Sequence, residues 1–144
     1  MRILTYLASF LFLFTACDKD ETKPNSTPTV DPNKPVLTLQ VTSPTTAKDL
    51  HVFVYPKDKP EERFTYDVSY SETPKVETAR QIGHGVDATF MIGAETEFKP
   101  VEGNVHAELL ADGKVIASLD FDTLNPPKDP ATSTYYIKKT VTIP

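Results

Sequence analysis

Apolar and polar residues alternate with a period of two through most of this chain, and this constrains its fold more than any other feature. The alternating segments are short, and Pro, Asp, Asn and Gly occur between them. A period of two lines one face of a β-strand, whereas a helix needs apolar residues three or four apart. No segment offers a convincing amphipathic helix, so the sequence predicts an all-β fold. The predicted strands cover residues 36–42, 50–55, 64–70, 76–82, 86–92, 105–109, 115–121 and 135–143.

Three parts of this pattern indicate where their strands lie. Residues 50–55 are apolar on both faces, which predicts a central strand. Residues 76–82 are more polar, which predicts an edge strand. Asp112-Gly113 supplies the positive φ angles that a tight turn requires, so it predicts a hairpin between its two flanking strands.

Seven or eight short strands without a helix predict a single antiparallel β-sandwich over residues 36–144. Residues 103–116, GNVHAELLADGKVI, resemble the central hairpin of extracellular modules of the immunoglobulin and fibronectin type III class. The resemblance implies an immunoglobulin-like sandwich. The chain has one Cys and no Trp, so the disulfide and core tryptophan of an antibody domain are missing. The core must therefore be held by apolar packing alone.

Residues 1–16, MRILTYLASFLFLFTA, have the plan of a cleaved secretory signal. Arg2 lies beside the initiator amine, and an uncharged apolar stretch follows it. This stretch is shorter than the roughly 20 residues that span a bilayer. The alternative is a buried N-terminal helix, which the lack of amphipathic spacing disfavours.

Cys17 is the only cysteine, which excludes an internal disulfide framework and a Cys-rich zinc site. Residues 13–17, LFTAC, resemble a bacterial lipobox, in which small residues precede a cysteine that takes up diacylglycerol. Phe14 departs from the usual Leu of that motif. The resemblance implies cleavage before Cys17 and a triacylated N-terminus. Such an anchor is stable, since each buried CH₂ contributes about 0.8 kcal/mol.

Residues 18–21, DKDE, resemble the lysine-plus-acidic export signal of surface lipoproteins of the Bacteroidota. This implies a place on the outer face of the outer membrane. In enterobacteria an aspartate directly after the lipidated cysteine instead indicates retention in the inner membrane, and the sequence leaves both readings open.

Residues 17–35 are predicted to be the lipidated cysteine and a disordered, proline-rich tether. Val30 is the only apolar residue after Cys17 in this stretch, so there is nothing to form a core. A proline-rich chain extends by roughly 3.1 Å per residue, which gives a spacer on the order of 50 Å. Its prolines recur every three or four residues, at Pro24, Pro28, Pro32 and Pro35.

The sequence shows no motif for catalysis, metal binding or a cofactor. His51, His84 and His106 are too far apart in sequence to form a local metal pair. A nucleophile elbow, a phosphate loop and a zinc-protease motif are all absent from the sequence. Asp120 and Asp122 suit calcium, but an exposed strand explains them better because no further ligands follow at loop spacing. We therefore expect a protein that is not an enzyme.

Aromatic residues offer the main alternative to a structural module. Phe64, Tyr66 and Tyr70 are predicted to share one strand face, and Tyr135 and Tyr136 to point to opposite faces of the last strand. Core packing is the favoured interpretation, and a platform for sugars is the alternative. The absence of Trp weighs against the platform, because Trp has the largest flat apolar face.

Thr123 is a candidate O-glycosylation site. The residues Asp122-Thr123-Leu124 resemble the three-residue glycosylation motif of exported Bacteroidota proteins, which implies a glycan on the threonine. An unmodified loop threonine is the alternative.

Loss of Arg2 with the signal leaves 14 basic and 20 acidic residues, a net charge of −6. This balance argues against nucleic acid and anionic membrane surfaces as partners, and it does not choose between proteins and glycans. The sequence thus predicts a surface-exposed lipoprotein of the outer membrane that presents a non-catalytic binding or structural module. The alternatives are an accessory glycan-binding lipoprotein of a polysaccharide-uptake system and, least favoured, a small hydrolase.

Overall fold

The computed structural model describes residues 30–45, 48–94 and 98–144. The predicted signal (residues 1–16), the predicted lipidation site Cys17 and the predicted tether as far as residue 29 lie outside the described residues. Within the described part of the chain, no helix is long and apolar enough to cross a bilayer.

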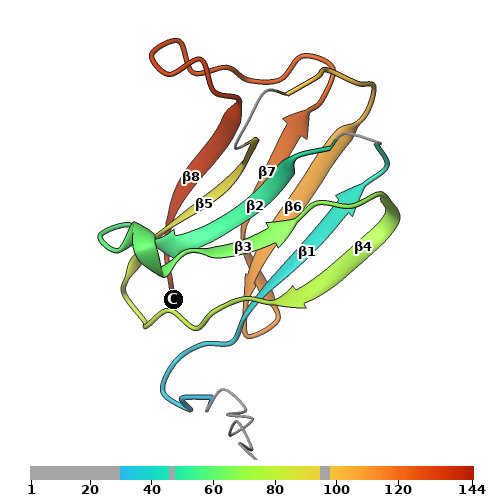
Figure 1. Ribbon diagram of the computed structural model, residues 1–144. Coiled ribbons are helices and arrows are strands. Elements are labelled where there is room, and N and C mark those ends of the chain that lie inside the picture. The colour runs from blue at the N-terminus through green and yellow to red at the C-terminus, as the bar shows by residue number, and fades with distance from the viewer. Residues whose placement is uncertain (1–29, 46–47, 95–97) are drawn as a thin grey trace, which may run out of the picture.

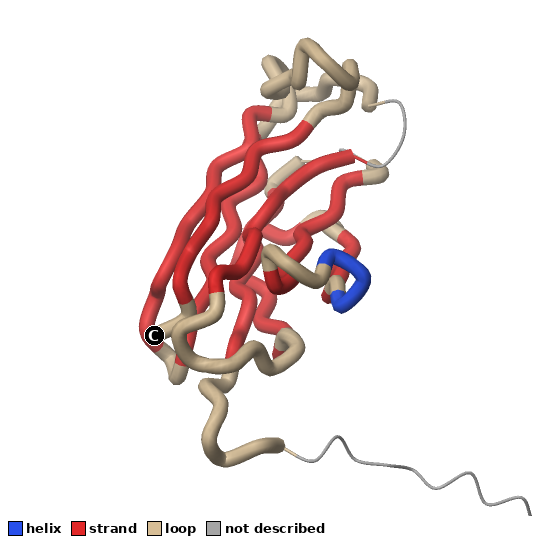
Figure 2. Tube along the Cα trace, turned by 90° about the vertical axis from the view of Figure 1, so that its left-hand side faces the viewer, coloured by secondary structure: helices blue, strands red, loops and turns tan. Residues whose placement is uncertain are grey.

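Eight strands form two antiparallel four-stranded sheets, and the sheets pack as the two layers of a sandwich (Figure 1). The strand orders are β4-β1-β6-β7 and β3-β2-β5-β8. The predicted all-β sandwich is confirmed, and the described residues contain a single short helical turn, η1 (Figure 2). The elements are β1 (Leu37–Ser43), β2 (Leu50–Pro56), η1 (Pro60–Glu62), β3 (Phe64–Asp67), β4 (Ser71–Thr78), β5 (Asp87–Ala94), β6 (Asn104–Ala111), β7 (Lys114–Asp122) and β8 (Tyr136–Thr142).

The connections between the strands give this sandwich its own topology. Only β2–β3 and β6–β7 are neighbours in both sequence and sheet, and every other consecutive pair crosses between the sheets. In the immunoglobulin constant-type order the first two strands are neighbours in one sheet. Here β1 and β2 lie in different sheets. The two-layer packing of that class is therefore shared, whereas the order of the strands differs.

The core lies between the two sheets and follows the predicted alternation. Leu37, Leu39 and Val41 of β1 are at most 2% exposed, and Phe90 and Ile92 of β5 are fully buried. Each such side chain stabilises the fold by about 1.5–3 kcal/mol on burial. β2 is central, as predicted, because it pairs with both β3 and β5.

The β6–β7 hairpin forms at the predicted turn, where Asp112 has a φ of 48° and Gly113 a φ of 77°. The prediction of which β7 side chains face the core is wrong at one residue. A register shift beside Leu110 leaves Ile116 as an extra residue, so Val115 is 52% exposed instead of facing the core with Ala117.

Two predicted strand ranges also need correction. The strand predicted over residues 64–70 ends at Asp67, and Tyr70 is 55% exposed. The edge strand predicted over residues 76–82 is present as β4 but runs from Ser71 to Thr78. Val76 is 62% exposed because its pairing partner, Gln40, also points away from the core.

The folded domain begins before residue 36, because Gln81 forms hydrogen bonds with residues at the end of the predicted tether. Its side-chain oxygen accepts a hydrogen bond from the Asp31 amide at 2.9 Å. Its amide nitrogen donates to the main-chain oxygens of Asp31 and Lys34, at 3.3 and 3.4 Å. Pro35 is buried. Residues 31–35 therefore belong to the domain.

The two ends of the sandwich differ in what they carry (Figure 1). The segment before β1 joins the domain at the lower end of the view, where β8 also ends. The long connection between β7 and β8, residues 123–135, lies at the opposite end. The β7–β8 connection therefore lies at the end of the domain away from the segment before β1.

Candidate functional site

An open hollow of about 590 Å³ lies on the outer face of the β3-β2-β5-β8 sheet. This volume falls within the range of roughly 300–1,000 Å³ that is usual for ligand sites. We call it the outer-face hollow. It is lined by Phe53, Tyr55, Arg63, Met91, Gly93, Ala94, Thr134, Tyr136 and Lys138.

Strand pairing brings these side chains together. Phe53 of β2 pairs with Met91 of β5, and Met91 pairs with Lys138 of β8, which makes one row across the sheet. Gly93 and Tyr136 pair in the next row. Since successive side chains point to opposite faces, these rows lie on the face away from the core.

The hollow depends on Gly93. A Cβ atom at this position would lie 2.9 Å from the Cβ of Tyr136 and 3.1 Å from the main-chain oxygen of Tyr135. No other residue type fits there without movement of β8. Tyr136 of β8 occupies the space that a side chain at residue 93 would need.

Both cations of the hollow lie over aromatic rings. The guanidinium carbon of Arg63 is 4.6 Å from the centroid of the Phe53 ring. The ammonium of Lys138 is 5.2 Å from the centroid of the Tyr136 ring. These cation–π contacts orient both charges. Phe53 is only 2% exposed although it lies on the outer face, so Arg63 helps to cover it.

The Tyr136 hydroxyl is held by the β7–β8 connection. It donates a hydrogen bond to the carboxylate of Asp129, which also accepts from the Ala131 amide at 2.7 Å. The shared hydrogen bond raises the pKa of Tyr136 and lowers the pKa of Asp129. At neutral pH the pair is therefore a neutral phenol and a carboxylate, and the ring is fixed at the rim of the hollow.

The aromatic residues singled out in the sequence lie elsewhere, apart from Tyr136. Phe64, Tyr66 and Tyr135 pack against the core, which confirms the core interpretation for these three. Tyr70 is exposed and donates a hydrogen bond to Glu72 at 2.6 Å. These residues therefore do not form the sugar platform that was the alternative, while Tyr135 and Tyr136 do point to opposite faces.

Three residues that line the hollow were not predicted from the sequence: Phe53, Tyr55 and Arg63. A signal for the first two was present, because residues 50–55 are apolar on both faces and only one face is needed for the core.

Thr123, the residue predicted to carry a glycan, lies inside the folded domain. Thr123 is fully buried, and its hydroxyl donates a hydrogen bond to the main-chain oxygen of Gly103 at 2.7 Å. Its amide donates to the same oxygen at 3.1 Å. The hydroxyl therefore closes the loop internally, and glycosylation of Thr123 stays a prediction.

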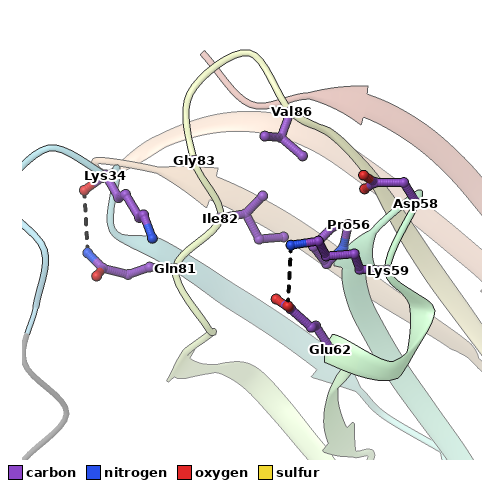
Figure 3. A pocket seen from close by; sticks show the side chains of 9 residues that line it. All are labelled: Lys34, Pro56, Asp58, Lys59, Glu62, Gln81, Ile82, Gly83 and Val86. Carbon is purple, nitrogen blue, oxygen red and sulfur yellow. Dashed lines mark hydrogen bonds and ion pairs between the residues drawn. The ribbon is translucent and has the colours of Figure 1, made fainter.

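A smaller hollow of about 180 Å³ lies where the segment before β1 meets the domain (Figure 3). Ile82 and Val86 give it an apolar lining, and polar side chains from the surrounding turns complete it (Figure 3). Its polar groups pair with one another: Lys59 lies 3.7 Å from Glu62, and Gln81 holds the segment before β1. These contacts hold the segment before β1 against the domain. We call the contact of Gln81 with Asp31 and Lys34 the Gln81 joint.

The three histidines lie apart. His106 shares a strand face with Glu108, as predicted, and its Nδ1 lies 2.7 Å from Asp120 Oδ1. His51 contacts Asp67 at 2.9 Å, and His84 donates to the main-chain oxygen of Pro144. Across the described ranges, no group of three His, Cys, Asp or Glu residues could hold a metal ion.

The carboxylates considered for calcium have separate roles. Asp120 is bound by His106, and its hydrogen bond is the main reason that the pKa of this histidine is raised. Asp122 accepts hydrogen bonds from the amides of Leu124 and Asn125, at 2.9 and 3.0 Å, which closes the turn after β7. Neither hollow is lined by a histidine, so His106 and its carboxylates are not set in either of them.

Comparison with protein-family models, curated proteins and solved structures gives no match. The functional argument therefore depends on the residues and geometry of this chain.

Proposed function

We propose that this chain is a lipoprotein of the outer membrane that presents its β-sandwich at the cell surface as a non-catalytic binding module. The observation that carries the proposal is the outer-face hollow, a ligand-sized site in a chain that also contains a lipidation motif.

The position of the hollow suits this role. Thr134 and Tyr136 border it beside the β7–β8 connection, at the opposite end of the sandwich from the Gln81 joint. The proposed tether is on the order of 50 Å long, and the joint lies at the end of the tether that is away from the membrane. This border of the hollow therefore lies on the part of the domain farther from the anchor.

The anchor is tested with Cys17→Ala in the full chain. We expect the wild-type protein to incorporate labelled palmitate and to sediment with membranes, and the variant to do neither. Ser26→Ala, a substitution within the tether, is the control and should behave as the wild type. A Cys17→Ala protein that still sediments at the mature length would show that lipid on Cys17 is not the anchor.

The membrane face is tested by protease treatment of intact cells. A protein on the outer surface is digested without lysis, whereas a protein retained at the inner membrane is cut only after lysis. Protection in intact cells would overturn the surface location and favour the retention reading of Asp18.

The second candidate function is an accessory glycan-binding lipoprotein of a polysaccharide-uptake system. The observation that favours it is the presence of Tyr55, Tyr136 and Thr134 in the hollow, because rings offer apolar faces and hydroxyls offer hydrogen bonds to sugars. The hydrolase alternative has no such support, since His106 and its carboxylates lie on a partly exposed strand face.

A further inference from the structure

We propose that two copies of this domain pair through β7, an edge strand of the β4-β1-β6-β7 sheet, and form a symmetric dimer. The inference goes beyond the proposed binding function and does not use the outer-face hollow. It follows from a comparison of the four edge strands and from the residues at the two ends of β7.

Three of the four edge strands are protected against pairing with another strand. The edge strand β3 has only four residues. β4 contains Pro74, and its Lys75 lies opposite buried Val41, so this charge points to the core side of the sheet. In β8, Lys139 lies in the same way opposite Phe90, which is fully buried. Short length, proline and inward charges all block pairing between sheet edges.

β7 lacks this protection along most of its length. It has nine residues, more than any other described strand, and none of them is a proline. Its core-facing side chains Ala117, Leu119 and Phe121 are apolar and at most 5% exposed. Lys114, beside the hairpin turn, is its only charge on the core side. Among the described residues β7 pairs only with β6, so the main-chain groups along its other side are open to a partner strand.

Opposite residues of an antiparallel pair point to the same face, and this limits the register of two β7 strands. The regular part of β7 begins at Ala117, after the extra residue Ile116. Pairing centred on Leu119 joins this part in both copies and places Ser118 opposite Asp120 of the other copy. Pairing centred on Asp120 would instead place two carboxylates opposite each other, which is destabilising. The register therefore puts the two-fold axis at Leu119.

The two ends of β7 complement each other in such a dimer. Val115, near the start of the strand, is 52% exposed, and Leu124, just after its end, is 53% exposed. Lys114 begins the strand, and Asp122 ends it. A two-fold axis brings the start of one β7 beside the end of the other, so apolar side chains and opposite charges meet twice in each dimer. This self-complementarity favours a second copy as the partner.

The dimer is compatible with the proposed anchor. The two tethers leave from opposite ends of the paired strands, and the nine residues of β7 span roughly 30 Å. The proposed tether is longer, on the order of 50 Å, so both lipids reach one membrane. In the other layer, the like charges of Lys139 from the two copies keep the β8 edges apart, so only the β4-β1-β6-β7 sheet becomes continuous.

Cross-linking of the full-length protein in membranes tests the pairing. Ser118→Cys places the thiols of the two copies at diagonal positions about 7–8 Å apart, within reach of a short bismaleimide. We expect this variant to give a species of twice the monomer mass. Thr78→Cys is the matched control, because Thr78 is also exposed but lies on β4, at the other edge of the same sheet. Wild-type protein, whose only cysteine is Cys17, is treated in parallel.

A substitution at one end of β7 should weaken the dimer. Val115→Asp removes the apolar contact and places a carboxylate beside Asp122 of the other copy, twice in each dimer. We expect the dimer dissociation constant, measured by analytical ultracentrifugation of the full chain in detergent, to rise by about tenfold. Val76→Asp is the matched control, because Val76 is 62% exposed but lies on β4, and it should change the constant by less than about twofold. Thermal unfolding monitors the fold of both variants.

Three results would overturn the inference. They are cross-linking of Ser118→Cys no stronger than that of the wild type, equal cross-linking of Thr78→Cys, and equal effects of Val115→Asp and Val76→Asp on the dissociation constant. Each would leave the proposed anchored module standing, which the separate fate of Cys17→Ala decides.

Discussion

Single residues decide whether β8 can approach β5 closely enough to form the hollow. Gly93 faces Tyr136 so tightly that a methyl group would contact the tyrosine Cβ at 2.9 Å. Gly83 offers a comparison within the same domain, because the nearest atom to its added Cβ would be Val86 Cγ2, at 3.8 Å. Alanine at residue 93 would therefore clash with backbone and Cβ atoms, whereas alanine at residue 83 would make ordinary van der Waals contact.

Gly93→Ala is expected to lower the free energy of unfolding by about 1–3 kcal/mol, since β8 must shift to relieve the contact. Gly83→Ala should change it by less than about 0.5 kcal/mol. Urea unfolding followed by circular dichroism measures both. Equal effects of the two substitutions would contradict the close approach as the cause.

His106 should titrate with Asp120 as its main partner. The hydrogen bond to Asp120 raises the pKa of His106 above its ordinary value, and Glu108 adds to the effect. A pKa raised by folding contributes stability that is fully present below the unfolded pKa of about 6.5 and is lost as pH rises through the folded pKa.

Asp120→Asn is expected to lower the pKa of His106, which NMR titration of its ring protons measures. Asp122→Asn is the control, because Asp122 lies on the same strand but binds the turn amides. An unchanged pKa of His106 in Asp120→Asn would show that this hydrogen bond is not the main cause.

At the scale of the element, the β6–β7 hairpin depends on its two-residue turn. Gly113 has a φ of 77°, a conformation that costs other residues roughly 1–2 kcal/mol. Gly113→Ala should therefore lower the free energy of unfolding by about 1 kcal/mol, with no steric clash because no atom lies within 4 Å of the added Cβ. Ser118→Ala on exposed β7 surface is the control, expected within about 0.5 kcal/mol of the wild type. Chemical denaturation of both variants is the measurement, and an unchanged Gly113→Ala would contradict a strained turn.

The strands were predictable because alternation is a local property of the sequence. Which side chains of β4 face the core was not predictable, because this depends on pairing with a strand that is distant in the sequence. Val76 faces solvent together with its pairing partner Gln40. The outer-face hollow was not predictable for the same reason. It joins Phe53 to Tyr136 through pairing with β5, and residues 50–55 alone show only that a second apolar face exists.

At the scale of the whole molecule, the domain has a fixed joint at one end and a ligand-sized hollow toward the other. Gln81 spans the joint through three hydrogen bonds to Asp31 and Lys34. The joint therefore fixes the direction of the chain just before β1. In the proposed lipoprotein, this direction determines which end of the sandwich faces away from the anchor.

Gln81→Leu should release the joint while leaving the sandwich folded. We expect faster hydrogen exchange at the Asp31 amide, which loses its acceptor on Gln81, and little change at core amides. Gln40→Leu is the matched control, because Gln40 is the only other glutamine and lies on the outer face of β1. Exchange measured by NMR distinguishes the two variants. If the Asp31 amide kept its protection in Gln81→Leu, the joint would be held by the backbone alone, and the orientation of the hollow would not depend on this side chain.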